Sequence, residues 1–213
     1  MRLFLPPAIH AVAIDDDIVF LDVAADAYFC LAGAGQAIVL GADGVVDALD
    51  PRAVAPLVEA GLLSEIDGAA RRIGPTAASA GLSPRGGAPS PRRLARALRA
   101  NLAAARAIEV LSFEALLDLA GRAQPAGPLA AAGAIQAEAA RFKRLAPWLP
   151  KGGVCLMRSL QMLLYLRAYG LRPAWVFGVR TWPFEAHCWL QAGEVVLDDH
   201  LDHVRAFSPI LTV

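Results

Sequence analysis

Residues 152–166 read GGVCLMRSLQMLLYL, and this stretch decides how the second half of the chain folds. A Gly-Gly pair ends a loop, and leucines then recur at the three-to-four-residue spacing of the buried face of a helix. Cys155 therefore falls in the first helical turn, where unpaired backbone N–H groups and the positive end of the helix dipole favour a thiolate. This position suits a nucleophile, although a buried, inert thiol is the common alternative for a helical cysteine.

Residues 174–199 supply the partners that a nucleophilic cysteine needs. The segments AWVFGVR, EAHCWLQ and EVVLDD read as three short strands joined by tight connections. His187 lies in the second strand, and Asp199 closes the third. In a Cys-His-Asp constellation the imidazole takes the thiol proton and the carboxylate fixes the ring tautomer, so both must stand on a rigid neighbour of the helix. We therefore expect Cys155, His187 and Asp199 to converge as nucleophile, base and orienting acid.

Three runs in this half of the chain resemble the leader peptidases of lasso-peptide biosynthesis, which are transglutaminase-like cysteine proteases. The runs are CLMRSLQMLLYLRAYGL, VFGVRTWPFEAHCWLQ and GEVVLDDHLDHVRAFSPI. That family is marked by Cys-Leu-x-Arg-Ser-Leu at a helix start, by Gly-Val-Arg…Pro-Phe-x-Ala-His, and by an acid after the histidine. The resemblance implies the same three catalytic residues. Asp198 stands where the family often has Asn, so Asp198 and Asp199 both stay candidates for the acid.

The resemblance also implies a function and partners. Members of the family cut the leader from a ribosomally made lasso-peptide precursor, and an asparagine-synthetase-like cyclase then closes the macrolactam ring on the freed core. Their reaction depends on ATP together with that cyclase. The chain itself has no GxxxxGK[ST] loop, so we expect no bound cofactor and no nucleotide site here. The expected partners are the precursor leader and the cyclase.

The charge distribution predicts two domains. Residues 1–67 hold eleven Asp/Glu against two Lys/Arg, whereas residues 68–213 hold nine against eighteen. Residues 68–91 are rich in Gly, Pro, Ser and Ala and are expected to form a flexible linker. We therefore expect an α+β chain with a recognition domain over 1–67 and a papain- or transglutaminase-like cysteine peptidase domain over 92–213.

The first domain is predicted to hold three strands between residues 10 and 31, followed by helices over 36–40 and 51–59, the latter with Asp50 as N-cap. This outline resembles the small winged-helix-like element that binds leader peptides in such pathways. There the leader adds as an extra strand beside the third strand. The leader-binding residues so implied are Tyr28, Phe29, Cys30 and Leu31. An ordinary β-meander whose edge is protected by acids is the alternative.

Two further side chains lie near the expected site. Arg158 is one helical turn after Cys155, where it can bind a substrate carbonyl or form an ion pair with Asp198. Cys188 points to the opposite strand face from His187 and is expected to serve only in packing.

Three alternative functions stay open. A zinc site can be drawn from four residues, but without CxxC or HExxH we expect no metal. Those four residues are Cys155, His187, His200 and His203. A non-catalytic peptide-binding protein would carry the same fold without turnover. An acyl-enzyme resolved by an amine instead of water would make the chain a transglutaminase-like acyl transferase.

The composition indicates the cellular compartment and the classes of partner that we expect. The chain has no apolar run of 18 residues and three cysteines at no disulfide spacing, so we expect a cytoplasmic protein that does not bind membranes. Residues 71–106 carry eight arginines and no acid, but no aromatic residue with which to stack bases. We expect these arginines to coat a helix or to contact acidic groups, and not to bind nucleic acid.

Overall fold

The computed structural model describes residues 2–41, 44–66, 74–83, 90–121, 131–150 and 154–213. By their internal contacts the residues form two compact units. The first comprises residues 1–74, 178–186 and 208–211, and the second comprises residues 75–177, 187–207 and 212–213. Among the described helices, none combines the length and the apolar content needed to cross a bilayer.

The described residues of the N-terminal segment 1–74 form two three-stranded antiparallel sheets and one α-helix. One sheet has the order β2-β3-β4 and the other the order β1-β6-β5. Fully buried residues from both sheets and from the helix, among them Leu3, Phe20 and Val54, make a single apolar core. The elements are β1 (Arg2–Phe4), β2 (Ile9–Ile14), β3 (Asp17–Asp22), β4 (Ala27–Leu31), the 3-10 turn η1 (Ala34–Gln36), β5 (Ile38–Leu40), β6 (Val45–Ala48) and α1 (Pro51–Glu59).

Several local predictions for this segment are confirmed. The three strands of the meander fall where the sequence indicates, and β4 has the predicted bounds. Helix α1 begins with Pro51 behind the N-cap Asp50, whose Oδ1 accepts a hydrogen bond from the Arg52 N–H at 2.9 Å. Gly61, just past the helix, has a φ of 73°, a conformation that glycine adopts without strain.

The helix predicted over residues 36–40 is wrong. The chain makes the 3-10 turn η1 and then the strand β5, which pairs with β6. Ile38 is buried and Val39 is 49% exposed, the alternation of a strand with one buried face. Because of the second sheet, this segment differs from the expected single sheet with two helices, and its likeness to a winged helix stays a prediction.

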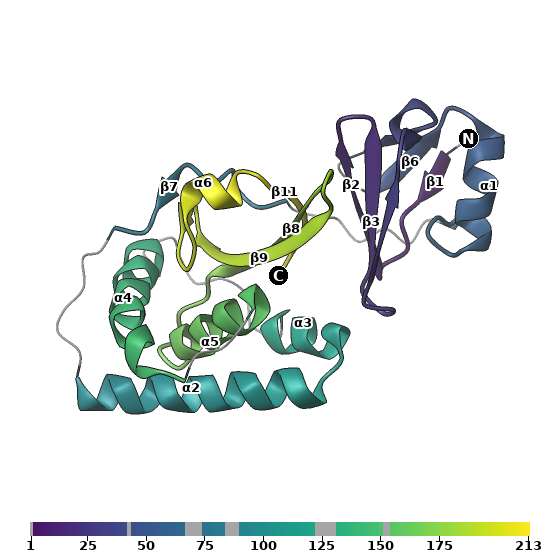
Figure 1. Ribbon diagram of the computed structural model, residues 1–213. Helices are drawn as coiled ribbons and strands as arrows, with labels where there is room; N and C mark the ends of the chain where they lie inside the picture. The colour runs from purple at the N-terminus through teal and green to yellow at the C-terminus, as the bar shows by residue number, and fades with distance from the viewer. Residues whose placement is uncertain (1, 42–43, 67–73, 84–89, 122–130, 151–153) are drawn as a thin grey trace. The chain divides into compact units, whose positions relative to one another are not determined.

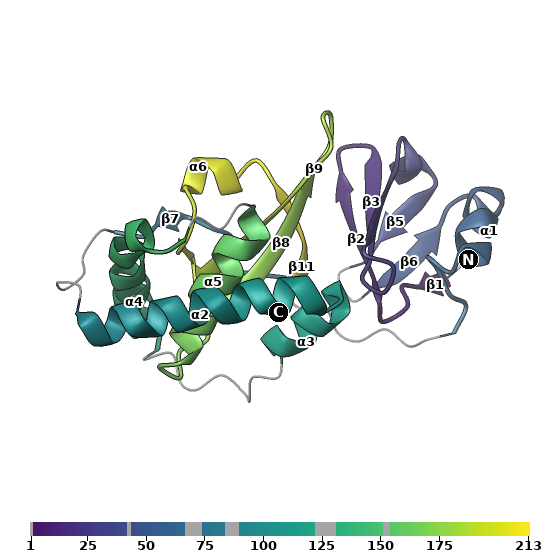
Figure 2. The ribbon, with the colours of Figure 1, turned by 60° about the horizontal axis from the view of Figure 1, so that its bottom comes forward.

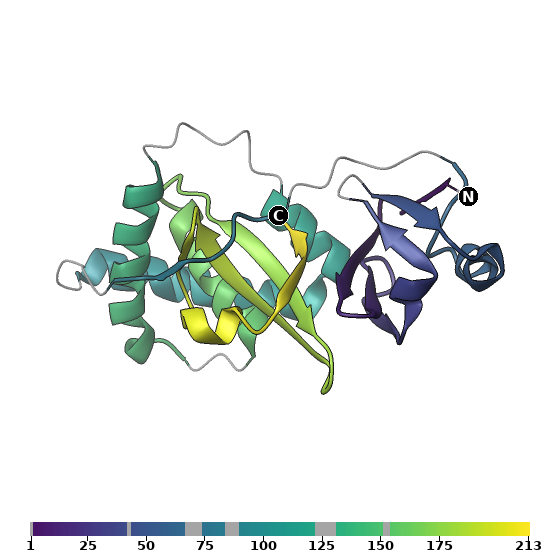
Figure 3. The same cartoon turned by 90° about the horizontal axis from the view of Figure 1, so that it is seen from above.

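The second half of the chain builds a five-stranded sheet of order β11-β8-β9-β10-β7 with helices on both faces. Helix α5 lies between this sheet and α2, whereas the short α6 lies on the opposite face (Figures 1, 2 and 3). Trp175, Trp189 and Tyr165 are the largest fully buried side chains. The elements are β7 (Ala80–Gly81), α2 (Pro91–Val110), α3 (Phe113–Gly121), α4 (Ala131–Leu145), the 3-10 turn η2 (Ala146–Trp148), α5 (Cys155–Arg167), β8 (Ala174–Arg180), β9 (Glu185–Ala192), β10 (Val195–Val196), α6 (Leu201–Val204) and β11 (Ser208–Thr212).

Part of the expected linker is docked on this sheet. Strand β7 pairs in parallel with β10, and the Leu82 N–H donates to the Val196 carbonyl at 2.9 Å. Ser79 Oγ and Glu194 Oε2 add a side-chain hydrogen bond of 2.6 Å. Residues 79–82 are therefore not the free tether that we expected, whereas residues 68–73 and 84–89 of the predicted linker lie outside the described residues.

The arginines of α2 are used within the fold. Arg96 places its guanidinium 4.5 Å from the centre of the Tyr169 ring, and Arg93 Nε donates to Glu138 Oε1 at 3.1 Å. Glu138 is almost fully buried and also accepts hydrogen bonds of 2.6 Å from the Tyr165 hydroxyl and from Arg141 Nη1. Burial raises the pKa of Glu138, but these three hydrogen bonds outweigh it and leave the pKa below its usual value. The carboxylate thus joins α2, α4 and α5.

We expect Glu138→Gln to lower the free energy of unfolding by about 1.5–3 kcal/mol, because it removes the charge that compensates the two arginines. Glu109→Gln is the matched control. Both side chains of the Arg106–Glu109 ion pair are over 70% exposed, so loss of this ion pair should lower the free energy of unfolding by less than about 1 kcal/mol. Urea unfolding of the two variants measures the difference, and equal losses would contradict a structural role for Glu138.

Candidate functional site

The predicted nucleophile begins a helix, as expected. Val154 is extended, with φ −83° and ψ 169°, and α5 starts at Cys155. The backbone N–H groups of this first turn have no partner inside the helix, so their dipoles favour negative charge on the thiol. Leu160 and Leu166 anchor the buried face of the helix. Cys155 is only half-buried, so it is not enclosed as an inert core thiol would be.

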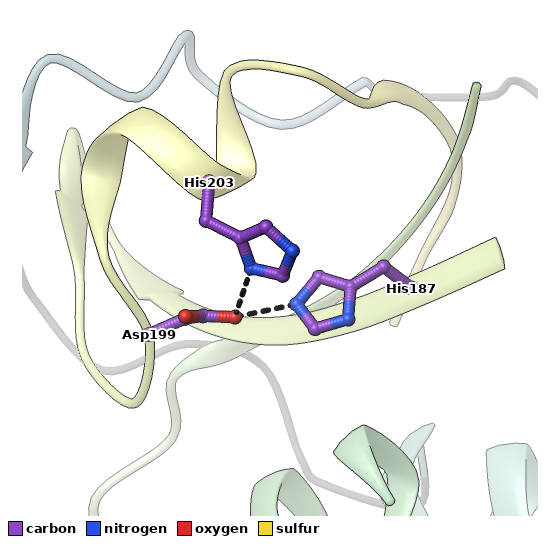
Figure 4. A group of neighbouring side chains, drawn as sticks. All are labelled: His187, Asp199 and His203. Carbon is purple, nitrogen blue, oxygen red and sulfur yellow. Dashed lines mark hydrogen bonds and ion pairs between the residues drawn. The ribbon is translucent and has the colours of Figure 1, made fainter. Parts of the chain in front are cut away.

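His187 and Asp199 meet on the sheet. His187 lies in β9, and Asp199 lies in the turn between β10 and α6. Since β10 pairs with β9, the chain returns the carboxylate to the histidine, and Nε2 of His187 lies 2.6 Å from Oδ2 of Asp199 (Figure 4). Both side chains are only 8% exposed. The ring of Trp189 stacks beside His187, with centroids 6.1 Å apart.

Asp198, the other candidate acid, has different partners. Its Oδ1 accepts a hydrogen bond from the Leu190 N–H at 2.8 Å, and burial raises its pKa to about 6. Its backbone carbonyl accepts a hydrogen bond from Arg158 Nη2 at 2.9 Å. The geometry thus places Asp199, and not Asp198, against His187. Arg158 thus contacts the main chain of Asp198, and its role in binding a substrate carbonyl stays a prediction.

Hydrogen bonds set the charges of Cys155 and His187. Contacts with Cys188 and His187 lower the pKa of Cys155 to about 4, although burial opposes them. Burial lowers the pKa of His187, but the hydrogen bonds to Cys155 and Asp199 outweigh it and raise the pKa above the ordinary value. Nε2 of His187 faces Asp199, so Nδ1 is the nitrogen left for the thiol. Above about pH 4 and below the raised pKa of His187, a thiolate therefore faces an imidazolium.

Asp199 keeps its charge in spite of its burial. Burial raises the pKa of this carboxyl, but hydrogen bonds from the His200 N–H, His203 and His187 outweigh it and hold the pKa below the usual value. The His200 N–H donates to Oδ1 at 2.7 Å. An ionised carboxylate is what the orienting role requires, because it stabilises the imidazolium.

Cys188 is a partner of the site that sequence reasoning missed. Strand alternation correctly puts it on the face opposite His187, but α5 packs on that face and brings the Cys155 thiol to it. Cys188 Sγ also lies 3.3 Å from Ser159 Oγ, which accepts a hydrogen bond of 2.8 Å from Trp175 Nε1. This hydrogen-bonded chain orients the Cys188 thiol, so its role is more than packing.

His203, which the sequence offered only as one of four possible zinc ligands, also lies at the site. Its Nδ1 lies 3.0 Å from Asp199 Oδ2, so His187 and His203 share one carboxylate oxygen. The two imidazole rings are 4.7 Å apart, and Phe207 packs against both. The signal was present in the sequence, because His203 follows Asp199 by four residues, one turn of a helix. His200 contributes its backbone to this cluster.

The residues implied for leader binding lie on β4. This strand is at the edge of the β2-β3-β4 sheet, and no described strand pairs with its other side. Phe29 is 41% exposed and Cys30 is also exposed, so side chains at this edge can contact a ligand. Their role in binding stays a prediction.

A helix that starts with a cysteine and packs on a sheet carrying histidine and aspartate is the arrangement of papain-like and transglutaminase-like proteins. A family model described as the transglutaminase-like superfamily matches residues 98–212, which is more than half of the chain. The chain therefore belongs to the transglutaminase-like superfamily. The matched range includes Cys155, His187 and Asp199. No curated protein and no solved structure gives a significant match.

The lowered pKa predicts how Cys155 reacts with iodoacetamide. Alkylation should stay fast down to about pH 5, because thiolate is the reactive form. Cys188→Ala removes the first of its hydrogen-bond partners and should shift the midpoint upward by roughly one pH unit.

Cys30 provides the internal control for this experiment. Burial and the charge of Asp17 raise its pKa, so it should react only in alkaline solution. Mass spectrometry of peptides separates the two cysteines. A Cys155 midpoint that coincides with that of Cys30 would contradict the assignment.

Proposed function

We propose that this chain is a cysteine peptidase that removes the leader from a ribosomally made lasso-peptide precursor. The observation that carries the proposal is the contact of His187 with Asp199 at 2.6 Å, beside a thiol of lowered pKa at the start of a helix. Membership of the transglutaminase-like superfamily supports thiol-dependent acyl chemistry. The resemblance of the sequence to lasso leader peptidases supports the substrate.

The reaction follows from the positions of these groups. The Cys155 thiolate attacks the carbonyl carbon at the leader–core junction, and the tetrahedral oxyanion then collapses to an acyl-enzyme. His187 gives its Nδ1 proton to the departing amine of the core, and Asp199 stabilises the imidazolium before that transfer. A water molecule, deprotonated by His187, then attacks the thioester and releases the leader as a carboxylate.

The edge strand β4 supports a role for the N-terminal segment in holding the leader. A peptide added beside β4 would gain main-chain hydrogen bonds from the strand and side-chain contacts from Phe29 and its neighbours. The freed core amine would pass to an asparagine-synthetase-like cyclase, which would consume the ATP. In this proposal the chain acts in the cytoplasm and binds no cofactor of its own.

Cys155→Ala should reduce the rate of precursor cleavage by a factor on the order of 10⁴, because the nucleophile is lost. Asp199→Asn should cause a loss on a similar scale, whereas Asp202→Asn, an exposed acid on α6, should be near the parent. Mass spectrometry of precursor incubated with the chain, with and without cyclase and ATP, measures the products.

Each outcome of that experiment decides between functions. Parent-like cleavage by Cys155→Ala would overturn the proposal. Leader joined to an added amine, with no free leader acid, would instead identify an acyl transferase. Leader binding without turnover by the parent, in the presence of cyclase and ATP, would identify a non-catalytic binding protein.

Phe29→Ala should weaken binding of a labelled leader peptide severalfold, because it removes an exposed aromatic contact on β4. Val39→Ala is the control, since Val39 is also exposed, at 49% against 41% for Phe29, but lies in β5 of the other sheet. Fluorescence anisotropy gives both affinities. Equal effects of the two variants would refute the assignment of β4 as the binding edge.

A further inference from the structure

Three metal-binding side chains converge beside the candidate catalytic cysteine. Nε2 of His187, a carboxylate oxygen of Asp199 and Nδ1 of His203 all lie within 4.8 Å of one another (Figure 4). They come from three places in the fold, namely β9, the turn before α6, and α6. His187 and Asp199 take part in the proposed mechanism, whereas His203 has no role in it.

The donor set and its spacing suit a zinc ion. Two imidazoles and a carboxylate leave a fourth position open, as in zinc sites that exchange a ligand. Bonds of about 2.0–2.2 Å from zinc place neighbouring ligand atoms about 3.3 Å apart in a tetrahedron. The present separations from Asp199 Oδ2 are 2.6 Å to His187 and 3.0 Å to His203. Zinc would therefore require Asp199 Oδ2 to lie about 0.7 Å farther from His187 and about 0.3 Å farther from His203, whose side chain is 48% exposed.

The surroundings hold these ligands in place. Asp199 Oδ1 accepts the His200 N–H at 2.7 Å, which leaves Oδ2 directed at the two histidines. Phe207 packs against both rings, at centroid distances of 5.1 and 5.4 Å. Contacts of this kind fix the orientation of metal ligands and strengthen metal binding.

We propose that His187, Asp199 and His203 form a binding site for zinc, and that zinc bound there reversibly inhibits the cysteine. The proposed inhibition of Cys155 rests on the proposed peptidase function, whereas the binding of zinc does not. On binding, Nε2 of His187 and Nδ1 of His203 lose to solvent the protons that they donate to Asp199, and each gives its lone pair to zinc, with no change of oxidation state. His187 then keeps a proton on Nδ1 only, and His203 on Nε2 only. The His187 ring then loses its hydrogen bond to Asp199 and can no longer act as the imidazolium that protonates the leaving amine.

Direct binding tests the site without relying on turnover. Zinc is titrated into the untagged full-length chain carrying Cys155→Ala, in competition with a chromogenic chelator. One zinc should bind per chain, and adding His203→Gln should weaken it at least about tenfold. His203→Ala should behave in the same way, whereas His200→Gln, which retains the backbone N–H, should bind as its parent. Loss of binding on Cys155→Ala, or no effect of both His203 variants, would overturn the proposal.

Inhibition is measured separately, in the chain with Cys155 intact. The rates of Cys155 alkylation and of precursor cleavage are measured with and without zinc. For each variant, both rates are divided by the rate of the same variant in the presence of a chelator. His203→Gln should need at least about tenfold more zinc for half inhibition. If precursor is never cleaved, the proposed function fails while the zinc titration still decides the site. Binding that leaves both rates unchanged would overturn the inhibitory role.

Discussion

The hydrogen bond between His187 and Asp199 is the contact on which the site depends. It joins β9 to the turn that follows β10, and it commits Nε2 of the ring to the carboxylate. Only then does Nδ1 remain for the thiol at the start of α5. The helix and the sheet are in turn held together by Ser159 of α5, which contacts Trp175 of β8 and Cys188 of β9. The strands that pack against α5 thus also determine which nitrogen of His187 faces the thiol.

Directed hydrogen bonds offset the burial of each charged group. Asp199 stays ionised because three N–H donors, from His187, His203 and the His200 backbone, meet its oxygens. Cys155 is held as a thiolate by Cys188 and His187 as well as by its place in the first turn. The ion pair is therefore formed before any substrate arrives. Such preorganised charge is what acyl chemistry at a thiol requires, which connects the geometry to the proposed peptidase.

The sequence predicted correctly those elements that local patterns determine. It failed for those that depend on pairing or packing with distant parts of the chain. Leucine spacing and the Gly-Gly pair placed the start of α5, and the Asp50-Pro51 pair placed α1. Residues 36–40 were too short to distinguish a helix from a strand, and β6 decided the matter by pairing. Alternation gave the face of Cys188 but could not say that α5 packs on it. Two adjacent aspartates were indistinguishable because the chain leaves β10 before them, where alternation no longer applies.

The central claim is that a thiolate and an imidazolium face each other in the resting protein. Nitrogen-15 NMR of the histidine side chains at pH 6 tests it most directly, with the signal of His187 assigned through His187→Gln. The account predicts that His187 is doubly protonated in the parent chain, and that its pKa, followed by titration of the same signals, falls when Cys155 is replaced by alanine, because one of the two charges that stabilise the imidazolium is gone. A His187 ring that is neutral at pH 6 in the parent, or a His187 pKa that does not fall when Cys155 is replaced, would contradict it.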